Sequence, residues 1–210
     1  MNPVQKIFTS LFMLIFSSLV AAETMEDYYS VLEQPQPTET GSKIEVLEIF
    51  WYGCPHCYAF EPYLREWLEN KPDNVEFRLM PGILNAGWVP HARAYYTAVE
   101  IGVLNKIHPR LFDAIHKDGR NIFNQQSIRE FFIEQGIKEI EFDRTYNSPE
   151  LDGKARAAYD YQRNCRITGV PSIIVNGKYV TSPSLAGSPE NVLKVIDYLI
   201  NKEMKGRDSQ

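Results

Sequence analysis

The sequence predicts an α/β fold whose two β-containing parts are separated by an inserted helical subdomain. Residues 43–51 are β-rich and apolar on both faces, which is typical of a central strand covered on both sides. From about residue 90 to residue 148 the apolar residues recur at helical spacing instead, and strand signals return near residue 172. With 210 residues, 44% of them hydrophobic, the chain can bury a core without structural disulfides.

The strand over 43–51 belongs to a predicted β-α-β unit. A short strand is expected before it, over 27–33, and a proline-rich loop separates the two. Pro55 suits the first turn of the next helix, along which apolar residues recur at helical spacing: Phe60, Leu64, Trp67 and Leu68. The following strand is expected over 74–80. Residues 52–54 therefore lie at a strand-to-helix turn.

The second β-containing part is predicted from a hairpin signal. Asn176-Gly177 lies between the apolar segments 172–175 and 178–181, and this dipeptide is the strongest short signal for a two-residue hairpin. A helix over 151–166 precedes the hairpin, and an amphipathic helix over 189–202 follows it.

These elements divide the chain into segments. The two parts of the α/β domain are expected over 23–83 and 149–203, and the inserted helical subdomain over 84–148. A flexible tail is expected over 204–210, and a targeting segment occupies residues 1–22.

The targeting segment has the pattern of a secretory signal peptide. Lys6 supplies a positive start, residues 7–20 are mostly apolar, and Ala21-Ala22 provides small residues for cleavage. An uncleaved anchor is the less favoured alternative, because the apolar stretch is short for a membrane span. The mature chain is expected to begin near Glu23, in an oxidising compartment.

Charge and cysteine count exclude two classes of protein. A net charge of −5 argues against nucleic acid as the main partner, since phosphate binding requires a basic face. Three cysteines are too few for a fold stapled by disulfides. Two of them, Cys54 and Cys57, form a CxxC pair, and Cys165 lies far along the chain. On its helix Cys165 is in phase with apolar residues, so we expect a buried, inert thiol.

A CxxC pair is either half of a metal site or a redox dithiol. A structural zinc site needs two further ligands at short spacing, whereas the histidines outside this motif are scattered at positions 91, 108 and 116. Helix phase favours the redox alternative: Cys57 faces the apolar side of its helix, and Cys54 lies at the helix start near solvent. The N–H groups and dipole of a helix N-terminus favour a thiolate there. This pattern predicts a reversible thiol–disulfide exchange site without a metal.

Two ionisable neighbours are expected to modify the dithiol. His56 lies between the sulfurs in sequence and can stabilise the Cys54 thiolate, unless it is simply exposed. Glu48 shares its strand face with apolar residues, so its pKa should be raised and it can transfer protons for Cys57. The alternatives for Glu48 are an ion pair with Arg78 or a strand end that reaches water.

Several motifs together resemble the DsbA family of periplasmic thiol:disulfide interchange proteins. These are Cys54-Pro55-His56-Cys57 with Tyr58-Ala59-Phe60 after it, Gly169-Val170-Pro171 before the hairpin, and an acid, Glu48, six residues before Cys54. The resemblance spans nearly the whole mature chain. It differs at the lone Cys165 and at Arg78, where the acid's basic partner is a lysine in well-known relatives.

The resemblance implies a thioredoxin-like fold and a periplasmic oxidase that introduces disulfide bonds into exported proteins. Its catalytic residues would be Cys54, Cys57, His56 and Pro55. Val170 and a cis Pro171 would bind substrate, and Glu48 would be a buried proton relay. The only redox group would be the Cys54–Cys57 disulfide, with no further cofactor.

The resemblance also implies partners: reduced, unfolded exported proteins as substrates, and a DsbB-like quinone-linked protein of the inner membrane for reoxidation. A monomer without nucleic acid is expected. A disulfide isomerase or reductase is the alternative enzyme, although the segment between Glu23 and Lys43 leaves no room for the separate dimerisation domain that such isomerases carry. From a different class, a peptide-binding chaperone or a metal carrier remains open. Trp51, Tyr52 and the 82–90 loop are candidates for apolar substrate contacts.

Overall fold

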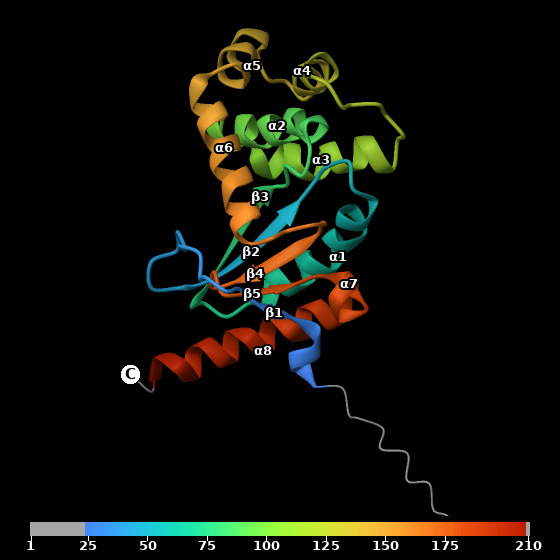
Figure 1. Ribbon diagram of the computed structural model, residues 1–210. Helices are drawn as coiled ribbons and strands as arrows, with labels where there is room; N and C mark the ends of the chain where they lie inside the picture. Colours follow the sequence, from blue (N-terminus) through green and yellow to red (C-terminus); the bar gives the residue numbers. More distant parts are fainter. Residues whose placement is uncertain (1–23, 209–210) are drawn as a thin grey trace, which may run out of the picture.

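The computed structural model describes residues 24–208. Figure 1 shows one twisted sheet with helices on both faces and a group of helices at one end of the sheet. The expected signal peptide over 1–22 lies outside the described residues. Within residues 24–208, no helix combines the length and the apolar character that a membrane span requires.

The sheet has five strands in the order β1-β5-β4-β2-β3. β2 and β3 are parallel, and the other neighbours are antiparallel. The expected strand over 27–33 is reduced to two residues, because residues 25–28 form a 3₁₀ turn instead. The strands are β1 (Ser30–Val31), β2 (Ile44–Phe50), β3 (Val75–Pro81), β4 (Ser172–Val175) and β5 (Tyr179–Thr181).

β2 is the central strand that the sequence predicted, and each of its residues is buried. The face with Val46 and Glu48 looks toward α1 (Pro55–Asn70) and α8 (Pro189–Asp208), whose apolar residues pack there. The face with Leu47 and Ile49 packs instead against the end of α6 (Pro149–Asn164) and the residues that follow it. Coverage on both faces explains why the strand lacks the usual alternation of apolar and polar residues.

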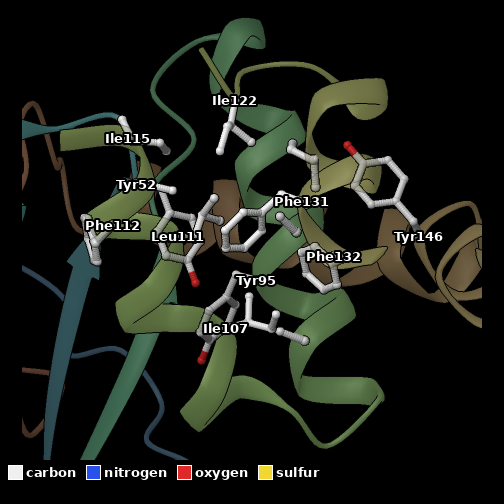
Figure 2. Close-up of a cluster of buried hydrophobic side chains, with 14 of the residues drawn as sticks. Tyr52, Tyr95, Ile107, Leu111, Phe112, Ile115, Ile122, Phe131, Phe132 and Tyr146 are labelled. Carbon is white, nitrogen blue, oxygen red and sulfur yellow. The ribbon is translucent and has the colours of Figure 1, made fainter. Parts of the chain in front are cut away.

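The inserted helices form a core that is continuous with the Cys54–Cys57 region. They are α2 (Val89–Glu100), α3 (Leu104–His116), α4 (Gln125–Glu134) and α5 (Glu139–Tyr146), preceded by a 3₁₀ turn, η2 (Ala86–Trp88). Figure 2 shows Leu111 and Phe131 of this core meeting Tyr52 from the turn after β2. The same apolar cluster includes Cys54 and Cys57. The helical insertion therefore forms one wall of the dithiol site.

The hairpin between β4 and β5 forms at the predicted dipeptide. Asn176 and Gly177 have φ values of 49° and 64°, as a two-residue turn with both central residues in the left-handed region requires. A Cβ on Gly177 would lie 2.1 Å from the carbonyl oxygen of Gln36, so glycine is also needed for close packing.

The C-terminal helix is longer than predicted. The segment expected to be a flexible tail continues α8 as far as Asp208. Buried Glu203 accepts hydrogen bonds from Lys178 and Tyr179 at 2.7 and 3.0 Å, and Arg207 donates to the carbonyl of Ser42. These contacts hold the end of the helix against the hairpin and the start of β2. A further short helix that the sequence analysis missed, α7 (Pro183–Ala186), precedes α8.

Candidate active site

The CxxC motif lies where β2 leaves the sheet and α1 begins. Cys54 is the N-cap residue of α1 and Pro55 occupies its first turn, as the sequence predicted. The backbone N–H of Cys54 donates to the carbonyl of Trp51 at 2.9 Å, and the Cys54 carbonyl accepts from the N–H of Tyr58 at 3.1 Å. These bonds close a tight turn and place the Cys54 sulfur at the helix N-terminus.

The two sulfurs have unequal access to solvent. Both cysteines are free thiols in this structure, Cys57 is fully buried, and Cys54 is 7% exposed. The predicted order of exposure is therefore right, but Cys54 is more enclosed than the sequence suggested. Val170 covers it: the Cys54 thiol donates to the Val170 carbonyl over 3.4 Å.

The two cysteines also differ in acidity. A hydrogen bond from the Cys57 side chain is the largest cause that lowers the pKa of Cys54 from 9.0 to about 6. Burial opposes this shift, while the backbone N–H groups of Cys57 and His56 add to it. Burial is the main reason why the pKa of Cys57 is raised far above its usual range. The environment therefore favours a thiolate at Cys54 and a protonated thiol at Cys57.

His56 contributes less than the sequence argument assigned to it. Its side chain is exposed and lines a groove beside the cysteines. The charge of its imidazole also lowers the pKa of Cys54, but it is the smallest of the causes. The helix terminus and the Cys57 thiol carry most of the stabilisation.

The Val170–Pro171 peptide bond is cis, as the family resemblance implied. The loop is held by a hydrogen bond of 2.7 Å from the Ser172 hydroxyl to the Gly169 carbonyl. A groove of about 990 Å³ runs from His56 past this loop to β1. Val170 and Pro171 both line this groove.

Glu48 is fully buried, and neither of its carboxylate oxygens has a hydrogen-bond partner. Burial, then the charge of Glu61, then that of Cys54 raise the pKa of Glu48 well above its usual range. The alternative of an ion pair with Arg78 is wrong. Arg78 pairs in register with Leu47, so it lies on the opposite face of the sheet, where it binds Glu45 at 3.0 Å.

Sequence reasoning missed a hydrogen-bonded chain next to Glu48. The Tyr52 hydroxyl lies 3.0 Å from Nδ1 of His108, and Nε2 of His108 lies 3.3 Å from a carboxylate oxygen of Glu61. Glu61 follows Cys57 by one helical turn, and this i, i+4 spacing was a signal that could have identified it. His108 comes from α3 in the insertion, and no local pattern linked it to the cysteines.

An aromatic cluster adjoins the active-site turn. The rings of Trp51 and Trp88 stack at 4.3 Å with an interplanar angle of 3°, and half-exposed Phe123 lies 6.1 Å from Trp51. A Cβ on Gly53 would lie 2.4 Å from the Trp51 ring, which explains the glycine before Cys54. This cluster includes Trp51 and the 82–90 loop, both expected to supply apolar contacts, whereas Tyr52 is buried behind it.

Cys165 belongs to a different apolar cluster from Cys54 and Cys57. It packs with Leu47, Ile49 and Ile174 on the α6 face of the sheet, and burial raises its pKa to about 12. It is a small buried hydrophobe there, as expected. Among the described residues, no cluster of three or more histidine, cysteine or acidic side chains could hold a metal ion.

Comparisons with known proteins agree with this geometry. The family model described as "DSBA-like thioredoxin domain" matches residues 83–191. The thiol:disulfide interchange protein DsbA of Pseudomonas syringae pv. tomato is 39% identical over 188 residues, which cover 89% of this chain and 88% of that protein. The chain belongs to the DsbA family.

Other DsbA proteins match to a similar extent. The DsbA of Azotobacter vinelandii is 40% identical over 83% of this chain and 82% of that protein. The crystal structure of Pseudomonas aeruginosa DsbA has a TM-score of 0.83 at 38% identity, and the match covers 89% of this chain and 97% of that one. The thioredoxin-like fold with a helical insertion is thereby confirmed, and the chain is a thiol:disulfide oxidoreductase.

Proposed function

We propose that this DsbA-family chain works as an oxidase, which introduces disulfide bonds into exported proteins through Cys54 and Cys57. The observation that carries this proposal is the difference between the two sulfurs. Cys54 has a pKa lowered to about 6 at a helix N-terminus, and Cys57 is a buried thiol with a raised pKa. A thiolate that forms readily is a good leaving group, so the reduced enzyme is stabilised and the disulfide is a good oxidant.

The exchange proceeds in two displacements. A substrate thiolate attacks the Cys54 sulfur, a substrate–Cys54 disulfide forms, and the Cys57 sulfur leaves with the electron pair of the broken bond. A second substrate thiolate then attacks the substrate sulfur of the mixed disulfide, and Cys54 leaves as a thiolate. The substrate gains a disulfide and loses two electrons, and the enzyme dithiol gains them.

Other site residues support these steps in our proposal. Pro55 starts the helix whose N-terminus stabilises Cys54, and His56 adds a smaller electrostatic contribution. The Val170–Pro171 loop aligns an extended substrate along the groove next to Cys54. Glu48, buried and unpaired, exchanges a proton with Cys57.

We further propose that the mature protein acts in the periplasm as a monomer, after cleavage near Glu23. It is reoxidised there by a DsbB-like quinone-linked inner-membrane protein, and it has no cofactor beyond its own disulfide. The two parts of the thioredoxin-like domain are 23–83 and 149–203, and residues 84–148 form the inserted subdomain. The family's DsbA relatives and the signal pattern of residues 1–22 support this assignment.

A redox equilibrium with glutathione tests the oxidase proposal. Thioredoxin, a reductase, has a potential near −270 mV and a cysteine pKa near 7. The lowered pKa of Cys54 stabilises the reduced form, so we expect a potential clearly less negative than that of thioredoxin. A value at or below thioredoxin's would contradict an oxidase. A Cys54→Ser, Cys57→Ser double variant that keeps full activity would instead indicate a chaperone.

A further inference from the structure

Two successive carbonyl groups in the turn before Cys54 have donors of different kinds. The carbonyl of Trp51 accepts from the backbone N–H of Cys54 at 2.9 Å, within the turn itself. The carbonyl of Tyr52 accepts from a side chain instead, since Nε2 of His116 lies 2.7 Å from it. His116 is the last residue of α3, so this bond joins the helical insertion to the active-site turn.

The hydrogen bond from His116 has a fixed direction. A carbonyl oxygen can only accept, so Nε2 carries a proton and donates it. Both the neutral ring and the charged ring can carry a proton on Nε2, so the bond does not depend on the charge of the ring. Tyr52 is 1% exposed, and a buried carbonyl that loses its donor is unfavourable. We therefore expect the turn to rearrange if the ring is removed.

The end of α3 also holds the His116 ring in place. The ring stacks on that of Tyr58, with centroids 5.0 Å apart and an interplanar angle of 16°, and it packs against Phe112 of α3 at 6.0 Å. Tyr58 donates its hydroxyl to Asp113 of α3 at 2.9 Å, and its N–H to the Cys54 carbonyl at 3.1 Å. The last turn of α3 therefore contacts the chain on both sides of the CxxC motif.

We propose that His116 is a positioning residue for thiol–disulfide exchange: its ring N–H binds the Tyr52 carbonyl and so fixes the turn that places the Cys54 sulfur at the N-terminus of α1. This inference rests on the proposed redox role of the dithiol. It gives the helical insertion a part in the exchange chemistry besides forming a wall of the site.

The position of the Cys54 sulfur matters more in the reduced form than in the oxidised form. In the reduced form the Cys57 thiol, and then the backbone N–H groups at the start of α1, favour a thiolate on Cys54. The effect of a helix N-terminus falls off within its first turn, so a sulfur that moves away loses part of it. In the oxidised form the bond to Cys57 fixes the sulfur covalently. Loss of the His116 bond should therefore destabilise mainly the reduced form.

Three substitutions of His116 test the proposal. His116→Leu removes the donor and keeps an apolar side chain of similar size, and in His116→Asn the amide nitrogen is one bond closer to the backbone than Nε2. Both should raise the Cys54 pKa by about one unit, a tenfold change in proton affinity, and shift the glutathione equilibrium toward the disulfide form. In His116→Gln the amide nitrogen can take the place of Nε2, so this variant should stay close to the wild type. Ultraviolet absorbance of the thiolate follows the pKa.

Tyr58→Phe is a matched control at the same contact. It removes the exposed hydrogen bond to Asp113 and keeps the ring that stacks on His116. Its Cys54 pKa and its glutathione equilibrium should therefore match those of the wild type. A shift as large as that of His116→Leu would mean that any loosening of α3 suffices, and it would overturn the specific role of His116.

Urea unfolding of both redox forms separates positioning from a purely structural role. If His116→Leu and His116→Asn destabilise both forms equally and leave the glutathione equilibrium unchanged, the inference is wrong, and an equal shift in His116→Gln would also contradict it. His116→Asn keeps the test decisive if His116→Leu does not fold. Each result is a difference from the wild type, whereas the potential of the wild type itself decides whether the protein is an oxidase.

Discussion

Each face of the central strand carries a buried glutamate, and the two differ in their hydrogen-bond partners. Glu45 and Glu48 both come from β2 and are both buried, at 1% and 0% exposure. On the α6 face, one oxygen of Glu45 accepts from Arg78 and from the backbone N–H of Glu39, at 3.0 and 2.9 Å. On the α1 face, Glu48 has no partner. Burial alone does not mark a functional group; burial without a partner, beside a reactive sulfur, does.

The cysteines repeat this contrast. Cys57 on the α1 face and Cys165 on the α6 face are both buried, and burial raises the pKa of each. Cys57 has a second thiol within hydrogen-bond reach, because Cys54 is the N-cap residue of the same helix.

Removal of a sulfur on either face should give the largest difference. Cys54→Ser should lower disulfide exchange on the order of a thousandfold or more, since the remaining Cys57 sulfur is fully buried and cannot form the mixed disulfide with substrate. Cys165→Ala should leave the exchange rate unchanged. A dithiol-oxidation assay with a reduced model protein measures both. A large loss of activity in Cys165→Ala would show that the α6 face takes part in catalysis.

Removal of one charged group on each face should separate stability from redox function. Arg78→Leu leaves the buried Glu45 carboxylate without its cationic partner, which should cost about 3 kcal/mol of unfolding free energy, with the redox potential unchanged. Glu48→Gln removes a carboxyl that has no partner, so stability should change by less than about 1 kcal/mol. Urea unfolding and a glutathione equilibrium give the two quantities for each variant. Equal losses of stability would mean that Glu48 is a structural residue like Glu45.

The lowered pKa of Cys54 links stability to pH in the reduced protein. Its folded value is about 6 against about 8.5 in an unfolded chain. The reduced form therefore gains stability that is fully present above about 8.5 and is lost as pH falls through about 6. Between these values its unfolding free energy, relative to the oxidised form, should rise with pH by at most about 1.4 kcal/mol per unit. Calorimetric scans of both redox forms at several pH values should show this slope. A flat difference would contradict a stabilised thiolate.

His56→Ser should have the smallest effect, because the imidazole charge is the weakest of the causes acting on Cys54. We expect the Cys54 pKa to rise by less than about one unit and the potential to fall by less than about 30 mV. Ultraviolet absorbance of the thiolate follows the pKa. A larger shift would show that His56, and not the helix terminus, is the main source of thiolate stabilisation.

Local patterns predicted most of the fold, and they failed where distant contacts decide the outcome. The buried strand, the helix start at Pro55 and the Asn176-Gly177 turn depend on neighbouring residues, and the structure has all of them. The short β1 and the ordered end of α8 depend on partners far along the chain, such as Ser42 for Arg207.

In the active site, too, features that depend on neighbouring residues were predictable and those that depend on distant contacts were not. The contrast between Cys54 and Cys57 follows from position on one helix, so it was predictable. The link from Tyr52 through His108 to Glu61 requires α3 of the insertion to pack against α1, which periodicity does not specify. The face occupied by Arg78 depends on the register between β2 and β3, and this also could not be derived from the sequence.

Brief alkylation of the reduced protein at about pH 5 tests the difference between the sulfurs most directly. A Cys54 pKa of about 6 leaves about a tenth of this residue as thiolate at that pH, whereas Cys57 and Cys165 stay protonated and buried. Mass mapping of the labelled peptides should therefore find the label on Cys54, well before either other cysteine reacts. Equal labelling of Cys54 and Cys57, or first labelling of Cys57 or Cys165, would contradict the account.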